Sequence, residues 1–357
     1  MKLQVTFTMA VSALALIASQ AVAENDKDKD KDDSPRISSK VALEISQIAT
    51  GDIGASLTMA LGEANSERSE RSFTMNGLVA TAAAIGNTLT LTDIDTNKDG
   101  LNLAQSMSDN VDATLDVDVR NANIFGMDLD AAQMTAAAIG NSLSLDSIKA
   151  GDLALEQKMS GEQVQTMATI DLKNVEVQQL DITLAAIGNS ATITNLGDYK
   201  LLSEQTVEND VEKIQAELDM GSLDGGRSSD HDHGRDSGFL TGETLNITVA
   251  AIGNSLTADL FNENEAKVDQ FNSAEEVSAN AKVNTGSIFN VSLTSAAIGN
   301  SATLGGVGGV QLAKINQSTS SEMSAIANVT SASAVTFDAT AAAIGNSLSI
   351  TNVIPEV

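Results

Sequence analysis

The residues with the clearest chemistry form an acidic segment, Asp95-Thr96-Asn97-Lys98-Asp99-Gly100. Oxygen-bearing side chains at alternate positions, followed by glycine, match the first half of a calcium-binding loop, in which carboxylate and amide oxygens converge on a hard cation. The twelfth position of such a loop carries a bidentate glutamate, whereas this chain has Ser106 there. Two interpretations stay open: a weak calcium site built from Asp95, Asn97 and Asp99, or an acidic turn between strands.

A second candidate for metal chemistry is Asp230-His231-Asp232-His233, which contains both histidines of the chain. Imidazole and carboxylate ligands together suit Zn²⁺ or Cu²⁺. The surrounding residues 221–238 are rich in Gly, Ser and Asp and interrupt one repeat, so they are predicted to form a surface loop. We favour a solvated loop over a metal site for this segment.

Other catalytic chemistry finds little support in the sequence. No Ser/His/Asp arrangement, paired-carboxylate pocket or Gly-rich phosphate loop stands out. The chain has no cysteine, which excludes disulfides, thiolate catalysis and Cys-bound zinc. Its formal net charge of −28 disfavours nucleic acid and anionic lipid as partners, because both would be repelled. We therefore predict that the chain is not an enzyme and has no cofactor apart from the calcium named above.

The first 40 residues have the pattern of an export leader followed by a spacer. Residues 1–23 combine Lys2, an apolar stretch over residues 5–18 and a terminal Ala-x-Ala site, which is typical of a secretory signal peptide. Residues 24–40 form an acidic arm of alternating Asp and Lys, a composition that predicts disorder. No later segment is long and apolar enough to span a bilayer. The sequence predicts a protein secreted to the surface or exterior of a Gram-negative bacterium, with the periplasm as the alternative.

The elements that carry these residues are set by a repeat. The tract Thr-x-Ala-Ala-Ile-Gly-Asn-Ser/Thr occurs six times within residues 41–357, at intervals of 46 to 65 residues. A motif at near-regular spacing is typical of repeat architectures, in which each unit buries its apolar face against its neighbours. Each copy is centred on a Gly-Asn pair: Gly86, Asn87, Gly140, Asn141, Gly188, Asn189, Gly253, Asn254, Gly299, Asn300, Gly345 and Asn346.

Apolar residues alternate on both sides of each Gly-Asn pair, which is the period of a β-strand and not of a helix. Before the pair they stand at odd offsets from the motif isoleucine, and after it at even offsets. A straight strand cannot keep such a set on one face. Because glycine and asparagine readily adopt positive φ, we predict that Ile-Gly-Asn is a structural β-arc joining two strands that face each other.

A second, weaker motif lies between the copies of the first. A glutamine precedes a further alternating run in each repeat, at Gln47, Gln105, Gln157, Gln205, Gln270 and Gln317. The unit is therefore about 23 residues long, and about twelve strand-arc-strand units pair into six repeats of mostly 46–54 residues. In one stretch, residues 207–220, a helical stripe is an alternative, but the other five copies favour strand.

Stacked units of this kind predict an all-β protein, a β-solenoid. With adjacent strands roughly 4.8 Å apart, twelve stacked layers would make a rod about 60 Å long. Identical residues of successive units would form ladders of Asn, Thr and Gln along the rod.

On these features the chain resembles the curlin and curlin-like repeat proteins of bacterial surface fibres. It also resembles the curlin-related surface proteins that anchor holdfasts in stalked Alphaproteobacteria. The resemblance covers residues 41–357 and rests on the unit length, the glutamine column and the Gly-Asn pairs, together with the leader and the lack of cysteine. It implies a secreted structural protein: a fibre subunit, adhesin or biofilm-matrix component that acts by stacked β-strand assembly. Its partners would be further copies of itself, other surface or fibre proteins, or polysaccharide.

The alternative is a monomeric solenoid that acts as a binding module for calcium, glycan or ice. Ser and Thr residues form two outward columns after each motif, such as Thr88 and Thr90 in the first copy. Ice-binding solenoids present similar flat strips of hydroxyls. Ser and Thr also fill ordinary strands, so the columns alone do not decide between the two functions.

Overall fold

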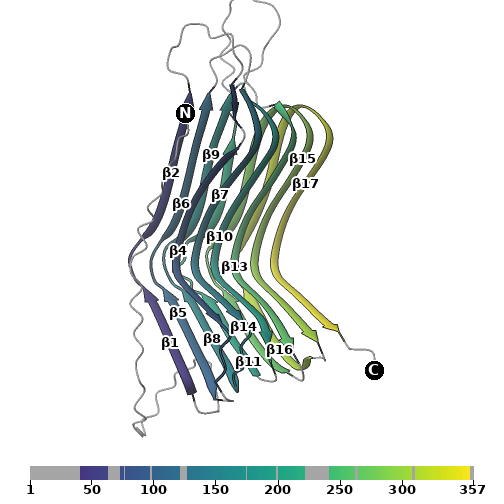
Figure 1. Cartoon of the computed structure of the whole chain (residues 1–357). Coiled ribbons are helices and arrows are strands. Elements are labelled where there is room, and N and C mark those ends of the chain that lie inside the picture. Colours follow the sequence, from purple (N-terminus) through teal and green to yellow (C-terminus); the bar gives the residue numbers. More distant parts are fainter. Residues whose placement is uncertain are drawn as a thin grey trace, which may run out of the picture.

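The structure of the chain, a computed structural model, is an all-β solenoid of stacked parallel strands (Figure 1). It describes residues 41–62, 73–75, 77–96, 99–120, 127–173, 175–197, 200–221, 241–261, 264–307 and 310–353. The predicted signal peptide, the acidic arm, Asn97, both histidines and residues 222–238 of the predicted loop lie outside these ranges.

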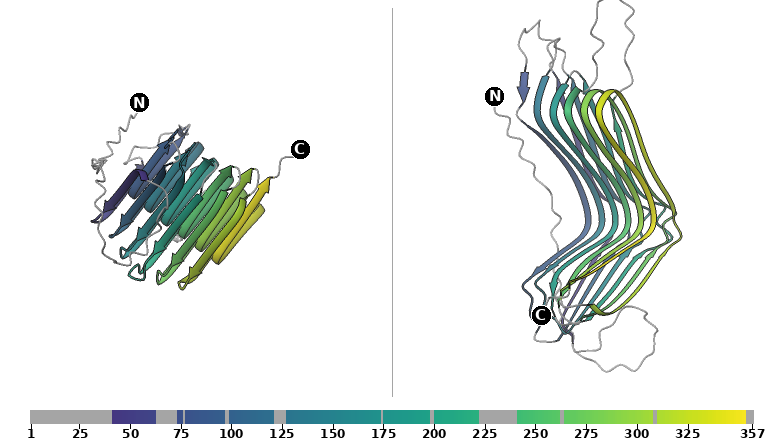
Figure 2. Two further views of the ribbon diagram at one scale, coloured as in Figure 1. Left: turned by 90° about the horizontal axis from the view of Figure 1, so that it is seen from below. Right: turned by 90° about the vertical axis from the view of Figure 1, so that its right-hand side faces the viewer.

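One turn of the solenoid, called a coil below, has two facing layers. The solenoid is bent, and the parts below and above the bend in Figure 1 are called the lower and upper limbs. The chain passes through a short strand of the lower limb, a tight turn and a short strand of the upper limb (Figures 1 and 2). It then returns along one long strand that bends in the middle. Coils 1 to 6 comprise residues 41–92, 100–146, 152–196, 200–261, 264–307 and 310–353.

The strands fall into three groups by their place in the coil. The short strands of the lower limb are β1 (Val41–Ala49), β5 (Gly100–Met107), β8 (Asp152–Met159), β11 (Lys200–Val207), β14 (Asn264–Asn272) and β16 (Val310–Thr319). Those of the upper limb are β2 (Ile53–Gly62), β6 (Val111–Arg120), β9 (Gln163–Lys173), β12 (Lys213–Met220) and the first parts of β15 (Glu276–Val307) and β17 (Glu322–Val353). The long strands are β3 (Phe73–Met75) with β4 (Leu78–Thr92), β7 (Met127–Asp146), β10 (Val175–Leu196), β13 (Thr241–Phe261) and the second parts of β15 and β17.

The predicted pairing of units into six repeats is confirmed, but the two halves of a unit do not face each other. Strand β4 continues through Ile-Gly-Asn without interruption, and the other long strands do the same. The buried face changes parity at the bend, from Ala84 to Asn87 in β4. The change is made by a bend within one continuous strand, so the two layers that face each other come from the two different units of one coil. Six coils, not twelve layers, stack along the axis, which makes the rod roughly 25 Å long.

Positive φ is not the reason for the motif glycines. The described glycines with positive φ are Gly51 and Gly221, neither of which belongs to the motif. A Cβ atom on Gly140 would instead lie 2.6 Å from the main-chain oxygen of Gly188 in the next coil, and the first five motif glycines all show such an overlap. Glycine is needed because the backbones of successive coils approach closely at the bend.

Residues 207–220, for which a helix was the alternative, contain the end of β11, a turn and strand β12. Side chains of β12 alternate between buried and half-buried, so the strand prediction is confirmed. Within the described ranges there is no helix that could cross a membrane.

Two apolar cores fill the space between the layers, one in each limb. Core residues of the upper limb include Leu115, Met134, Ile182 and Val249, and those of the lower limb include Leu103, Leu145, Leu155 and Ile193. A belt of buried asparagine and glutamine separates the two cores. The small side chains of the repeat suit such a thin interior.

The two layers of the solenoid are offset along its axis by half of the spacing between neighbouring strands, an offset called the half-step below. Strand β4 packs against both β2 of its own coil and β6 of the next, and β7 packs against both β6 and β9. The offset arises because the chain advances continuously along the solenoid axis and the long strand comes last in each coil. As a result, short strands are outermost at the N-terminal end, whereas the long part of β17 is outermost at the C-terminal end (Figure 1).

Candidate functional site

A ladder of six glutamines runs along the solenoid next to the bend. Each side-chain nitrogen donates to the side-chain oxygen of the glutamine in the preceding coil, at 2.7–2.8 Å, from Gln105 to Gln47 and so on to Gln317. The same nitrogen also donates across the layers to the long strand of its own coil, as from Gln157 Nε2 to Ser190 O at 2.9 Å. Because the carbonyl contact fixes which amide atom is nitrogen, the ladder has a defined direction.

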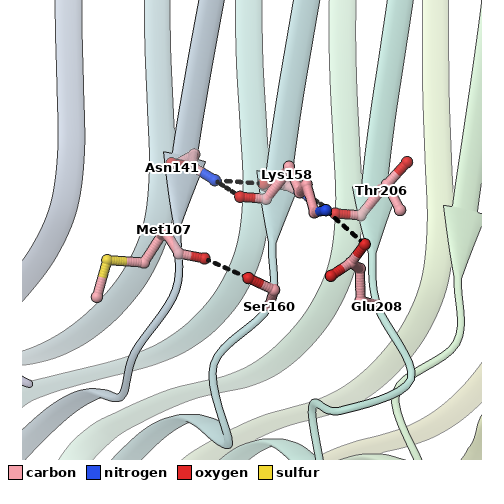
Figure 3. A network of polar contacts seen from close by, with 7 residues as sticks. Met107, Asn141, Lys158, Ser160, Thr206 and Glu208 are labelled. Atoms are coloured by element: carbon pink, nitrogen blue, oxygen red, sulfur yellow. Dashed lines mark hydrogen bonds and ion pairs between the residues drawn. The ribbon is translucent and has the colours of Figure 1, made fainter. Parts of the chain in front are cut away.

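A ladder of six asparagines runs beside it in the opposite direction. Each side-chain nitrogen donates at 2.8 Å to the asparagine oxygen of the following coil, from Asn87 to Asn346. It also donates to the short strand of that following coil, as from Asn141 Nδ2 to Lys158 O at 2.8 Å (Figure 3). The glutamine ladder thus points its donors toward the N-terminal end, and the asparagine ladder toward the C-terminal end.

The interior members of both ladders are fully buried, Gln157 and Asn189 among them. A buried amide group without a partner costs about 1–3 kcal/mol, so a shift of one coil against the next would be penalised at two positions at once. The nearby ion pair of Lys158 with Glu208, 2.6 Å long, lies at the surface and contributes much less (Figure 3). The ladders therefore fix the register between coils.

At the N-terminal end the ladders stop with one donor and one acceptor unused. Gln47 Nε2 donates to Thr88 O at 2.9 Å, and its second N–H meets no acceptor in the described part of the chain. Asn87 Oδ1 likewise receives no hydrogen bond from the described residues.

At the C-terminal end the unused groups are reversed. Gln317 Oε1 accepts nothing within the described ranges, although its nitrogen makes both of the usual bonds. Within the described residues Asn346 Nδ2 has no short strand of a following coil to donate to, and it makes a 3.4 Å contact with Gln317 O of its own coil.

The C-terminal end also exposes apolar side chains that point inward. Phe337, Leu348 and Ile350 are 51%, 49% and 47% exposed. Their register partners in coil 5, namely Val291, Ala302 and Leu304, are at most 3% exposed. The difference follows from the half-step, because among the described strands none covers this part of the last long strand.

Both ends of the solenoid carry strand edges that pair on one side. Strands β16 and β17 pair with β14 and β15, and among the described strands they have no second neighbour. At the other end β1, β2 and β4 pair with β5, β6 and β7 alone, again within what the structure describes. A 32-residue edge such as β17 is a template for adding another strand.

Asp95, Thr96 and Asp99 of the predicted calcium segment lie between β4 and β5. Asp95 bridges to Lys149 of the next coil, where Thr96 N also donates to Lys149 O at 2.9 Å. Asp99 O accepts from Gly151 N at 2.9 Å. In the described ranges no three His, Cys, Asp or Glu residues are grouped so that they could hold a metal ion. Since Asn97 lies outside these ranges, the calcium site stays a prediction.

The outward hydroxyl columns lie along the lower half of the long strands. The outer column is exposed in every coil, at Thr90, Ser144, Thr192, Thr257, Thr303 and Ser349. Their parallel register makes each column continuous from coil to coil.

A family model for holdfast attachment protein D matches residues 72–217 and 237–357. The chain belongs to the holdfast attachment protein D family. In this chain the match runs from just before β3 through coil 6, and its interruption, residues 218–236, begins within the last residues of β12 and ends before β13. Membership in the holdfast attachment protein D family assigns the chain to holdfast attachment at the bacterial cell surface. No curated protein and no solved structure matches the chain.

Sequence reasoning found the Gln and Asn columns but missed the apolar C-terminal end. One signal was present, because Phe337 is the only aromatic residue in a column otherwise made of Leu, Val and Ala. The sequence by itself does not show that, among the described strands, none covers this column in the last coil.

Proposed function

We propose that the chain is a non-enzymatic structural protein that connects the holdfast to the cell surface through stacked β-strands. The observation that carries this proposal is the pair of open ends, where unpaired strand edges, unused amide groups and apolar side chains occur together. The bends and the buried ladders would give the solenoid a fixed register along its length. In this proposal no residue performs chemistry, and Ile-Gly-Asn and the ladders are the functional elements.

Strand addition at the open edges is the proposed mode of assembly, as in the curlin-like proteins that the sequence resembles. Main-chain hydrogen bonds would supply much of the affinity and the side-chain columns the specificity. The net charge of −28 opposes association, and salt or divalent cations would screen that repulsion. Export by the predicted signal peptide and a place on the outer surface of a Gram-negative cell belong to the same proposal.

Deleting the gene in a holdfast-producing strain tests the structural role. We expect holdfast material to be made but released into the medium, so that surface attachment falls while the released adhesive rises. Complementation with the unaltered chain should restore attachment. Attachment that is unchanged after deletion would overturn the proposal.

The second candidate is a monomeric binding module, and the observations that favour it are the continuous hydroxyl columns and the position of Asp95 and Asp99 between β4 and β5. Glycan or ice would lie along the columns, and calcium would bind Asp95 and Asp99. Calorimetry of the purified chain with calcium is the direct test of the cation. A heat of binding that disappears in Asp95→Ala supports the site, and a titration unchanged by that substitution removes it.

A further inference from the structure

We propose that the C-terminal coil binds the N-terminal coil of a second copy of this chain, in the register that relates successive coils within one copy. This inference rests on the proposed function, since end-to-end stacking is one way to build a structural connection. It specifies the partner, the two ends that meet and the direction of growth.

The half-step between the layers makes the two ends complementary in shape. Among the described strands, the long strand at the C-terminal end has no covering short strand, and the short strands at the N-terminal end have no preceding coil. If coil 1 of a second copy follows coil 6, its β1 and β2 cover the exposed inner face of β17. Its β4 then pairs with the edge of that same long strand.

The unused amide groups are complementary as well. The Gln317 oxygen would accept from the Gln47 nitrogen of the second copy, which is the bond that every interior glutamine makes. The Asn346 nitrogen would donate to the Asn87 oxygen of the second copy and to the main chain just after its Gln47. Both ladders would then continue across the junction with every amide paired.

The apolar columns also continue across the junction. Extending the register places Phe337 beside Leu78 of the second copy, and Leu348 beside its Leu89. The inward residues Ile45 and Ile53 of coil 1 are half-buried in one copy and belong to the same core columns. Burial of these side chains would supply the main driving force.

One charged pair adds specificity. The glutamine register that joins Gln317 to Gln47 places Lys314 opposite Glu44 of the second copy, and both side chains are exposed in one copy. Opposite charges on neighbouring strands of a junction favour this register over others.

Like ends do not match in the same way. Two C-terminal ends would bring two glutamine oxygens and two uncovered long strands together, and two N-terminal ends would bring two glutamine donors together. A contact between unlike ends does not close on itself, so repeated addition produces an open, polar filament.

Gly345→Ala is the substitution that separates folding from assembly. In one copy its Cβ would meet Thr319 Cγ2 at 3.2 Å, whereas a Cβ on Gly299 would meet the Gly345 main-chain oxygen at 2.4 Å. In the junction the main-chain oxygen of Gly86 in the second copy would lie against Gly345 as the Gly345 oxygen lies against Gly299, so a Cβ on residue 345 would overlap it. We expect Gly345→Ala to fold normally by circular dichroism and thermal melting, but to require at least about tenfold more protein for filaments in sedimentation and electron microscopy. The matched control is Ser349→Ala, which removes an exposed outward hydroxyl of the same strand and should assemble like the unaltered chain.

Polarity is tested by crosslinking, because the chain has no cysteine of its own. Thr90→Cys and Ser349→Cys in one chain place thiols in the same outward column, on neighbouring strands of the proposed junction. A short bis-maleimide should then give a series of covalent oligomers, and each single variant should give none. Dimers formed by Ser349→Cys alone would show contact between like ends and overturn the proposal.

Charge exchange gives an independent check on register. Lys314→Glu should weaken assembly, and Glu44→Lys added to the same chain should restore it. Failure of the double variant to recover would contradict the proposed register. A chain that stays monomeric at high concentration, with and without salt or calcium, would overturn the inference altogether.

The two proposals can fail separately. If deletion abolishes attachment but Gly345→Ala still assembles and attaches, the structural function stands and the junction is wrong. If Gly345→Ala blocks filaments but deletion leaves attachment intact, the junction stands and the proposed function is wrong.

Discussion

Coil 5 and coil 6 carry the same motif in the same register, yet their side chains have different surroundings. Leu304 in coil 5 is completely buried, whereas its partner Ile350 is 47% exposed. Asn300 bonds to both neighbouring coils, whereas the Asn346 nitrogen reaches only a weak contact in its own coil. Equivalent residues are therefore buried and fully hydrogen-bonded in one coil and exposed at the end of the solenoid in the next.

The largest difference between the coils is expected at the motif glycines. Gly299→Ala forces a Cβ against the carbonyl of Gly345, which cannot move without separating the coils, so we expect a loss of roughly 4 kcal/mol or more. Gly345→Ala should cost little in dilute solution. Urea unfolding of both variants measures the difference, and similar losses would contradict the close-approach explanation.

The apolar columns should show the next largest effect. Leu304→Ala leaves a cavity in a packed core and should cost about 3 kcal/mol. Ile350→Ala removes a half-exposed side chain and should cost below about 1 kcal/mol while the chain is monomeric. Thermal and urea unfolding at low concentration would test this, and the gap should narrow once filaments form.

Removing one glutamine should have a smaller effect that depends on its place in the ladder. Gln157→Leu leaves the Gln105 oxygen and one Gln205 donor unpaired in the interior, with an expected cost of about 2 kcal/mol. Gln317→Leu affects one neighbour at an open end and should cost less than half as much. Equal losses in urea unfolding would show that the ladder does not stabilise the interior more than the end.

The smallest predicted effect concerns Asp112, a half-buried residue of strand β6 in coil 2. Burial raises the pKa of Asp112, while its hydrogen bond from Gln163 opposes that shift. A raised pKa in the folded chain means that ionised Asp112 lowers stability at neutral pH, and that the penalty fades as the pH falls through the folded pKa. Asp112→Asn should therefore melt slightly higher at pH 7, and no higher below about pH 4. A difference that is the same at both pH values would contradict this assignment.

Much of the architecture could be predicted from local patterns in the chain. The alternation of apolar residues gave strands, the spacing of the motif gave six repeats, and the parity change located the bend at Gly-Asn. The glutamine column could be predicted because a repeated polar residue in an apolar run has to find identical partners in neighbouring repeats. The reason for the motif glycines could not be predicted, because it is a close approach to the backbone of the next coil, which is distant in the sequence.

The sequence by itself determined the strand period, the number of repeats and the residues that line up in columns, since these follow from the two-residue period of a pleated strand and from the repeat. The tertiary structure decided that the two halves of one unit do not face each other, and that the two layers are offset by half of the strand spacing. It likewise decided that the glutamine and asparagine ladders run in opposite directions. It also decided which columns are exposed at the ends. Burial depends on whether another coil lies beyond, and no pattern within one coil contains that information.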